Sequence, residues 1–145
     1  MKISDDLKKR LLAEIDFCIA KIKEEENTRK KLYYFSGVYG VVERIMRMDF
    51  DPQLLLVHAA LNICYNSIMG LVESRERGDI AREIPENLSE RLLEYLGELR
   101  MEIAEDQDTY KTLEKFMSLA YQTTGPGYYS MQFFEYLKTK ALTSL

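Results

Sequence analysis

The sequence contains no tryptophan, one histidine, two cysteines, three prolines and seven glycines among its 145 residues. So few prolines and glycines leave little room for the tight turns of an all-β fold. A single histidine excludes ferritin-like di-iron sites, which need two Glu-x-x-His pairs, as well as zinc sites built on several histidines. The stretch Thr-Gly-Pro-Gly at 124–127 matches no phosphate-binding loop. We therefore expect no cofactor.

The two cysteines, Cys18 and Cys64, both fall on the apolar faces of predicted helices. Neither belongs to a CxxC motif or to a metal-binding cysteine–histidine spacing, so we interpret both as buried, reduced thiols of a cytoplasmic protein. The charged and polar N-terminus predicts no signal peptide. Cys64 cannot act together with His58, because their spacing on one helix places the side chains about 120° apart around its axis.

The overall composition is that of a folded protein. Hydrophobic residues make up 46% of the chain and charged residues 30%, which argues against disorder. The length predicts one domain, residues 1–145, with a substantial core. The net charge of −4 argues against bulk electrostatic binding to nucleic acid or to an anionic membrane, but it is compatible with a local basic patch.

A long helix over Pro52–Arg77 is the organising element of the predicted fold. Asp51 is a good N-cap, Pro52 suits the first turn, and Gly78 suits the left-handed position after the last turn. Its apolar residues cover roughly half of the helix circumference, so several other segments must pack against it. These residues are Leu54, Leu56, Val57, Ala60, Leu61, Ile63, Cys64, Ile68, Leu71 and Val72. Polar residues at 58, 62, 66 and 67 interrupt the apolar stretch, so we expect no membrane span.

Two helices are predicted before the long one. Ser4 caps the first, which runs to about Glu26 and carries an apolar stripe at spacings of four and three. The stripe consists of Leu7, Leu11, Ile15, Cys18 and Ile22. Asn27 and Thr28 break or bend this helix. The segment that follows, 29–49, also has apolar residues at helical spacing, namely Leu32, Phe35, Val38, Val42, Ile45 and Met46.

The stretch 31–42 within this second segment is ambiguous. It is rich in tyrosine and valine, which favour strands, and Ser36-Gly37 suits a two-residue hairpin turn. We favour a helix, because one isolated hairpin among helices would be marginally stable. As a helix, the stretch would place Gly37 and Gly40 where a neighbouring helix approaches closely.

The clearest periodicity in the chain lies over 88–121. Asn87 is the expected N-cap, with Glu90 completing a variant of the capping box. The residues that follow have the 4-3-4-3 spacing of a heptad seam. They are Leu92, Leu96, Leu99, Ile103, Asp106, Tyr110, Leu113, Met117 and Ala120. The unbroken phase favours one continuous or merely kinked helix, although Asp106–Asp108 is also compatible with the end of one helix and the start of another.

Asp106 is the one carboxylate in this seam. An unpaired carboxylate would be costly in a packed seam. We therefore expect Asp106 either to mark a kink or to face a basic residue of a neighbouring chain. The candidates for that partner are Arg44, Arg47 and Arg100.

Ser130 is predicted to cap a last helix, whose inner side would carry Met131, Phe134, Leu137, Ala141 and Leu142. The predicted fold is therefore all-α, an antiparallel bundle of about five helices in which one helix is long and heptad-patterned. Fusion of the first two helices would leave four.

Four glutamates form the candidate metal site. Glu73 with Glu76, and Glu102 with Glu105, each place two carboxylates one helical turn apart. Helical enzymes that act on nucleotide phosphates bind Mg²⁺ through such pairs on facing helices. The alternative interpretation is a solvated charged face.

A basic and aromatic cluster at Arg29, Lys30, Lys31 and Tyr33 is the candidate nucleic-acid site. Such mixtures hold single strands through phosphate contacts and base stacking. Tyrosine on a bundle surface is, however, also common without any nucleic acid.

His58, Asn62 and Asn66 follow one another at intervals of one helical turn along the otherwise apolar long helix, and we call these three residues the polar ribbon. It is the candidate lining of a small ligand pocket, because a pocket needs only a few convergent polar groups. The alternative is that neighbouring side chains satisfy it.

The leading functional hypothesis is a non-enzymatic helical interaction or assembly protein that self-associates through helix packing. The heptad seam and the ten tyrosines and seven methionines motivate it. We expect a homo-oligomer, with a dimer favoured, that is compatible with a role as a small subunit beside another protein partner. The alternatives are a Mg²⁺-dependent helical enzyme acting on nucleotides and a nucleic-acid-binding helical subunit.

Overall fold

A computed structural model of the chain describes residues 1–79, 83–124 and 135–140. It contains helices α1 (Asp5–Glu24), α2 (Thr28–Met48), α3 (Pro52–Arg77), α4 (Leu88–Ala104) and α5 (Tyr110–Thr124), and residues 135–140 are also helical. No strand occurs in these described ranges. The all-α prediction is therefore confirmed.

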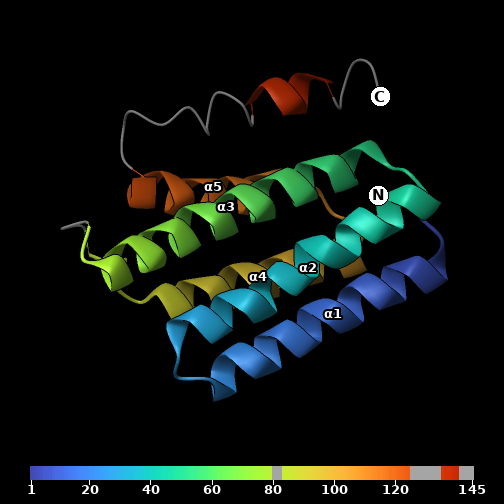
Figure 1. Cartoon of the computed structure of the whole chain (residues 1–145). Coiled ribbons are helices and arrows are strands. Elements are labelled where there is room, and N and C mark those ends of the chain that lie inside the picture. Colours follow the sequence, from blue (N-terminus) through green and yellow to red (C-terminus); the bar gives the residue numbers. More distant parts are fainter. Residues whose placement is uncertain (80–82, 125–134, 141–145) are drawn as a thin grey trace.

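The helices close into a ring around a shared core. Contacts join α1 to α2, α2 to α3, α3 to α5, α5 to α4 and α4 back to α1, and Figure 1 shows the long helices running alongside one another. The largest fully buried side chains come from all five helices and include Leu11, Phe35, Leu54, Leu92 and Phe116. The apolar stripes predicted from helical spacing therefore face one common interior.

The predicted signals around α3 are confirmed. The Asp51 carboxylate accepts a hydrogen bond from the backbone N–H of Gln53 at 2.8 Å, and Pro52 stands in the first turn. Gly78 ends the helix with a φ of 74°, the left-handed conformation that glycine adopts without strain. Of the described helices, α3 is the one long and apolar enough to cross a membrane, and 56% of its most apolar window is buried inside the bundle.

The ambiguous stretch 31–42 is helical, because α2 continues from Thr28 to Met48 without a break. Asn27 separates it from α1 by accepting a hydrogen bond from the Lys30 N–H at 3.0 Å. One face of α2 buries the apolar side chains Leu32, Phe35, Val38, Val42 and Ile45. Burial of this stripe explains why the strand-forming tyrosines and valines take helical geometry.

The prediction for the two glycines of α2 is half right. A Cβ atom built on Gly37 would meet the Glu14 carboxylate of α1 at 2.5 Å, so this position is a close approach. A Cβ on Gly40 would meet nothing within 4 Å, so no neighbour approaches that residue closely. The helical pattern placed both glycines near the partner helix, but only Gly37 lies beneath a side chain from it.

The heptad-patterned helix is not continuous, and this corrects our preference for continuity. It divides into α4 and α5, and Asp106 between them has a φ of 54°. The Gln107 N–H donates to the Glu102 carbonyl at 2.8 Å and the Asp106 N–H to the Ile103 carbonyl at 3.3 Å. These are the two bonds of a Schellman motif, which terminates a helix at a left-handed residue.

The heptad spacing continues across this break because both helices bury their seam residues inside the same bundle. Leu92, Leu96, Leu99 and Ile103 of α4 and Leu113, Met117 and Ala120 of α5 are buried. The Asp108 carboxylate then accepts a hydrogen bond from the Tyr110 N–H at 2.9 Å, at the start of α5. A preserved phase is therefore compatible with a reversal of direction.

Asn87 precedes α4 as predicted, but its φ is 57° and its side chain makes no capping hydrogen bond. The predicted capping box is therefore wrong. Ser130, the expected cap of the last helix, lies outside the described residues. Leu137 lies in the described helical segment 135–140 and packs, half-buried, against the core.

Candidate functional site

The two pairs of glutamates proposed as metal ligands lie at the ends of different helices. Glu73 and Glu76, near the end of α3, both bind Arg29 of α2, with N–O distances of 3.4 and 2.6 Å. The hydrogen bond from Arg29 also lowers the pKa of Glu76. The Arg29 guanidinium thus occupies the position that a cation would need between these two carboxylates.

The second pair, Glu102 and Glu105, stands at the end of α4. Glu102 Oε1 is buried and has no hydrogen-bond partner within the described part of the chain. A lone carboxylate oxygen is not a metal site, however, because Mg²⁺ takes several oxygen ligands. Among the described residues, no three histidine, cysteine or carboxylate groups gather where they could hold a metal ion.

The basic cluster proposed for nucleic acid is largely engaged within the protein. Besides its two carboxylate partners on α3, Arg29 contacts the Tyr33 hydroxyl at 3.5 Å. The Lys31 ammonium donates to the Ser89 hydroxyl of α4 at 2.7 Å. Lys30 and Tyr33 are exposed. A phosphate would therefore have to compete with protein groups for two of the three cations.

The polar ribbon lies at the α2–α3 contact, and two of its three members bind each other. Asn66 Nδ2 donates to the backbone carbonyl and to the side-chain oxygen of Asn62, at 2.9 and 3.1 Å. The rings of Tyr39 and His58 stand edge to face, with their centres 5.7 Å apart. These mutual contacts favour the interpretation that neighbouring side chains satisfy the ribbon.

His58 is half-buried in this arrangement. Burial lowers the pKa of His58 from its ordinary value, and the nearby Glu43 carboxylate opposes the shift. Burial likewise raises the pKa of Tyr39. Both groups are thereby held in their neutral forms near pH 7.

A groove on the outer face of the α1–α2 hairpin was not predicted as a site. It encloses about 520 Å³. The wall from α1 consists of Arg10, Ala13, Glu14 and Phe17. The wall from α2 consists of Val41, Arg44, Ile45 and Met48. The α1–α2 groove is thus lined by apolar and charged side chains together.

Large apolar side chains of the α1–α2 groove are open to solvent. Phe17 is 49% exposed and Met48 is 53% exposed. The Phe17 ring also stands edge to face against Tyr34 at 6.3 Å, and the Lys21 ammonium lies over both rings. This aromatic pair extends the apolar surface along the hairpin beyond the groove itself.

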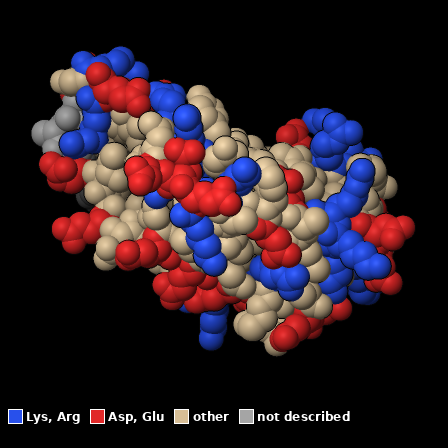
Figure 2. Space-filling view, turned by 90° about the horizontal axis from the view of Figure 1, so that it is seen from below, with Lys and Arg blue, Asp and Glu red and all other residues tan. Residues whose placement is uncertain are grey.

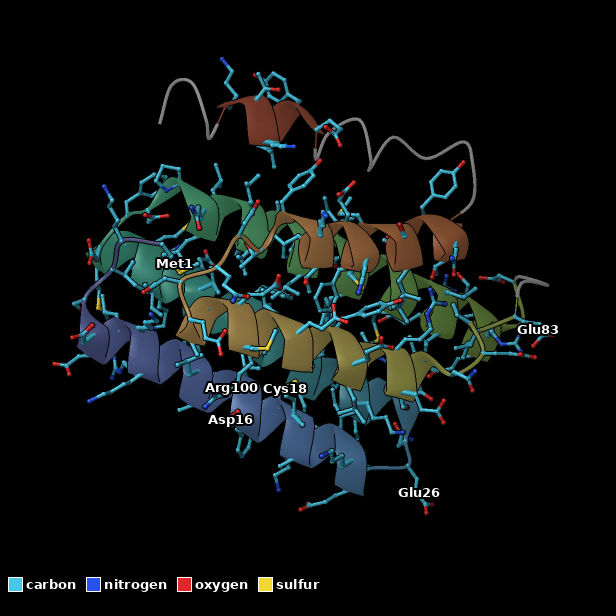
Figure 3. The ribbon with its side chains drawn as sticks, turned by 180° about the vertical axis from the view of Figure 1, so that it is seen from behind. Met1, Asp16, Cys18, Glu26, Glu83 and Arg100 are labelled. Carbon is cyan, nitrogen blue, oxygen red and sulfur yellow. The ribbon has the colours of Figure 1, made fainter. Side chains whose placement is uncertain are left out.

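Cations mark one end of the α1–α2 groove. Neither Arg10 nor Arg44 takes part in an ion pair within the described ranges. Figure 2, which faces α1, shows lysine and arginine side chains gathered toward the end of this surface where α1 begins. On the α4 side of α1, by contrast, Arg100 is paired with Asp16 at 3.0 Å, and Figure 3 shows the two side chains pointing toward one another.

A signal for the α1–α2 groove does exist in the sequence. Arg10 and Phe17 are seven residues apart on α1, and Tyr34, Val41 and Met48 follow one another at the same spacing on α2. Residues seven apart share a helix face, so each helix carries a second stripe besides its core stripe. Sequence reasoning missed it because the stripe mixes apolar and charged residues.

We compared the chain with protein-family models, with curated proteins and with solved structures, and none of them matches it.

Proposed function

We propose that this chain is a non-enzymatic helical interaction protein that self-associates through helix packing, and that the α1–α2 groove is its docking surface. The observation that carries the proposal is that Phe17 and Met48, two large apolar side chains that line this groove, are each about half exposed. Side chains of this size are usually buried, so their exposure along a concave surface marks a place where another surface binds.

The composition of the groove supports this proposal. Protein interfaces are enriched in aromatic residues, methionine and arginine, with apolar side chains at the centre and polar ones at the rim. The groove offers the same kinds of side chain, with Phe17 and Met48 lining it beside Arg10 and Arg44. A helix or helix pair laid along the groove would remove these apolar surfaces from water.

An enzymatic role has less support. The reactive groups favoured from the sequence bind one another, as Arg29 does with Glu76 and Asn66 with Asn62. Side chains that already have hydrogen-bond partners must break those bonds before they can bind a substrate or a metal ion. An interaction surface requires no such rearrangement, because the α1–α2 groove is already open.

The oligomeric state of the purified protein tests the proposal. We expect light scattering coupled to size exclusion to give the mass of a dimer at tens of micromolar, and Phe17→Ser to shift the protein toward the monomer. Met101→Ser is the matched control, because Met101 is 48% exposed on α4, away from the groove. A clean monomer at tens of micromolar, or equal loss of the dimer in both variants, would contradict the proposal.

A further inference from the structure

Charges of both signs occur all along α1, but on the face that carries Phe17 a cation and a carboxylate stand one heptad to either side of that ring. Arg10 precedes Phe17, and Glu24 follows it toward the end of the hairpin that holds Glu26. Arg10 and Glu24 each stand seven residues from Phe17, about 10 Å along the axis, and share its face of the helix. Figure 3 shows Glu26 at the end of the hairpin opposite to Met1.

The second helix of the hairpin strengthens the positive end. Arg44 of α2 lines the groove together with Arg10 of α1, because the end of α2 lies beside the beginning of α1. The acidic end is open to a partner: the Glu24 side chain is 72% exposed and its nearest cation, Lys21, is 3.9 Å away. An exposed pair at this distance contributes little stability, so Glu24 is available for a second cation.

We propose that a second copy of this chain docks on the α1–α2 groove in antiparallel orientation, with the twofold axis passing beside Phe17. This inference rests on the self-association proposed above and specifies its geometry. In this arrangement Arg10 and Arg44 of each copy face Glu24 of the other, and Glu14 comes near Lys21 across the axis. The two Phe17 rings meet at the centre, where both are withdrawn from water.

The antiparallel orientation is the one that the charges favour. A parallel twofold arrangement would place Arg10 against Arg10 and Glu24 against Glu24, and like charges that face each other oppose association. A twofold interface is also closed, because the same surface patch of each copy contacts that of the other and no patch is left to bind a third copy. The dimer therefore uses the α1–α2 groove together with the adjoining end of α1 that carries Lys21 and Glu24.

Engineered cysteines on α1 separate the two orientations without changing any charge. Ala13 and Ala20 are both exposed and lie on either side of Phe17. Counted from the twofold axis, Ala13 of one copy comes within about one residue of Ala20 of the other. The two copies of Ala13 lie roughly 12 Å apart along the axis, and the two copies of Ala20 roughly 9 Å, both beyond the reach of a disulfide.

The native thiols do not interfere with this measurement. Cys18 and Cys64 are both buried. Burial, helped by the Glu14 carboxylate, raises the pKa of Cys18 to about 12, and burial also raises the pKa of Cys64. Since the thiolate is the reactive form, oxidation selects the introduced cysteines.

We expect a mixture of the full-length Ala13→Cys and Ala20→Cys variants to give a disulfide-linked heterodimer under mild oxidation, while each variant alone remains uncrosslinked. Self-crosslinking of each single variant would show the parallel arrangement and overturn this inference. A dimer by light scattering without any crosslink would overturn the geometry but leave self-association intact. A monomer under all conditions would overturn both.

A charge exchange provides the second measurement. Arg10→Glu should weaken dimerisation about tenfold or more, because it places two carboxylates opposite each other at both ends of the interface. Adding Glu24→Arg to the same chain should restore the dissociation constant to within about threefold of the original. Equal weakening by the single and the double variant would contradict the proposed pairing.

Discussion

The ammonium group of Lys8 binds the carboxylate of Asp106 at 2.9 Å and so ties the first turns of α1 to the end of α4. The hydrogen bond from Lys8 lowers the pKa of Asp106. Sequence reasoning offered two alternatives, a kink at Asp106 or a partner among Arg44, Arg47 and Arg100 of a neighbouring chain. The chain does break its helix at Asp106, and within one molecule the basic partner is Lys8. Asp106 serves two purposes here, since it also takes the left-handed conformation that ends α4.

The first prediction concerns this left-handed position. Asp106→Leu should lower the melting temperature by several degrees, because a branched side chain is strained at a φ of 54° and the contact with Lys8 is lost. Asp106→Gly loses the same contact but relieves the backbone, so its melting temperature should stay close to that of the unchanged protein. Thermal melts followed by circular dichroism give the melting temperatures of the two variants and of the unchanged protein. A leucine variant that melts above the glycine variant would contradict this prediction.

The second prediction uses the helix glycines. A Cβ atom on Gly40, Gly70 or Gly97 would meet nothing within 4 Å. Replacing each by alanine should therefore raise the free energy of unfolding by about 0.5–1 kcal/mol, since alanine loses less backbone entropy in a helix. Gly78→Ala is the matched control and should lower the free energy of unfolding, because a φ of 74° strains any residue with a side chain. Urea denaturation gives all four values, and a destabilised Gly97→Ala would contradict this explanation.

The third prediction concerns the aromatic centre of the core. The rings of Phe35 and Phe116 lie 5.8 Å apart, and neither side chain is exposed. Phe116→Ala should lower the free energy of unfolding by about 3–5 kcal/mol, through lost burial and the cavity left behind. Phe50, which is 50% exposed between α2 and α3, provides the control. Phe50→Ala should change the free energy of unfolding by less than about 1 kcal/mol. Urea denaturation distinguishes them, and equal losses would argue against Phe116 as a core residue.

The fourth prediction is a pH dependence from the single histidine. The pKa of His58 in the folded protein lies below its ordinary value of 6.5, because burial disfavours the charged ring. The unfolded chain therefore binds a proton on His58 more readily than the folded chain does. The free energy of unfolding should fall as the pH drops from about 7 through 6.5 to the lower folded pKa, and it should lose this contribution below that pKa.

The His58 prediction is checked by titrating the imidazole signals in an NMR spectrum and by urea denaturation across the same pH range. His58→Gln removes the titrating group and should flatten the stability profile above pH 5.5. A midpoint above 6.5 would mean that the Glu43 carboxylate outweighs burial, and it would reverse the sign of the effect.

How far the sequence predicts the site depends on the range of the interaction. Ser4, Asp51 and Gly78 were assigned correctly as helix-end residues, because a cap bonds to backbone within a few residues of itself. The partners of Arg29 and Lys8 were not foreseen, because these contacts join residues 47 and 98 positions apart. No local pattern specifies which of several cations approaches a given carboxylate.

Residue spacing and short-range capping are enough to predict that the described chain is helical and which face of each helix is apolar. The packing of the helices, in contrast, is what makes the heptad repeat reverse direction at Asp106, because either a straight or a folded pair of helices can bury the same phase. It also decided that Phe17 stays at the surface while Phe35 does not. Burial is a property of the whole packing, in which α1 and α2 cover each other's core stripes and leave their second stripes open.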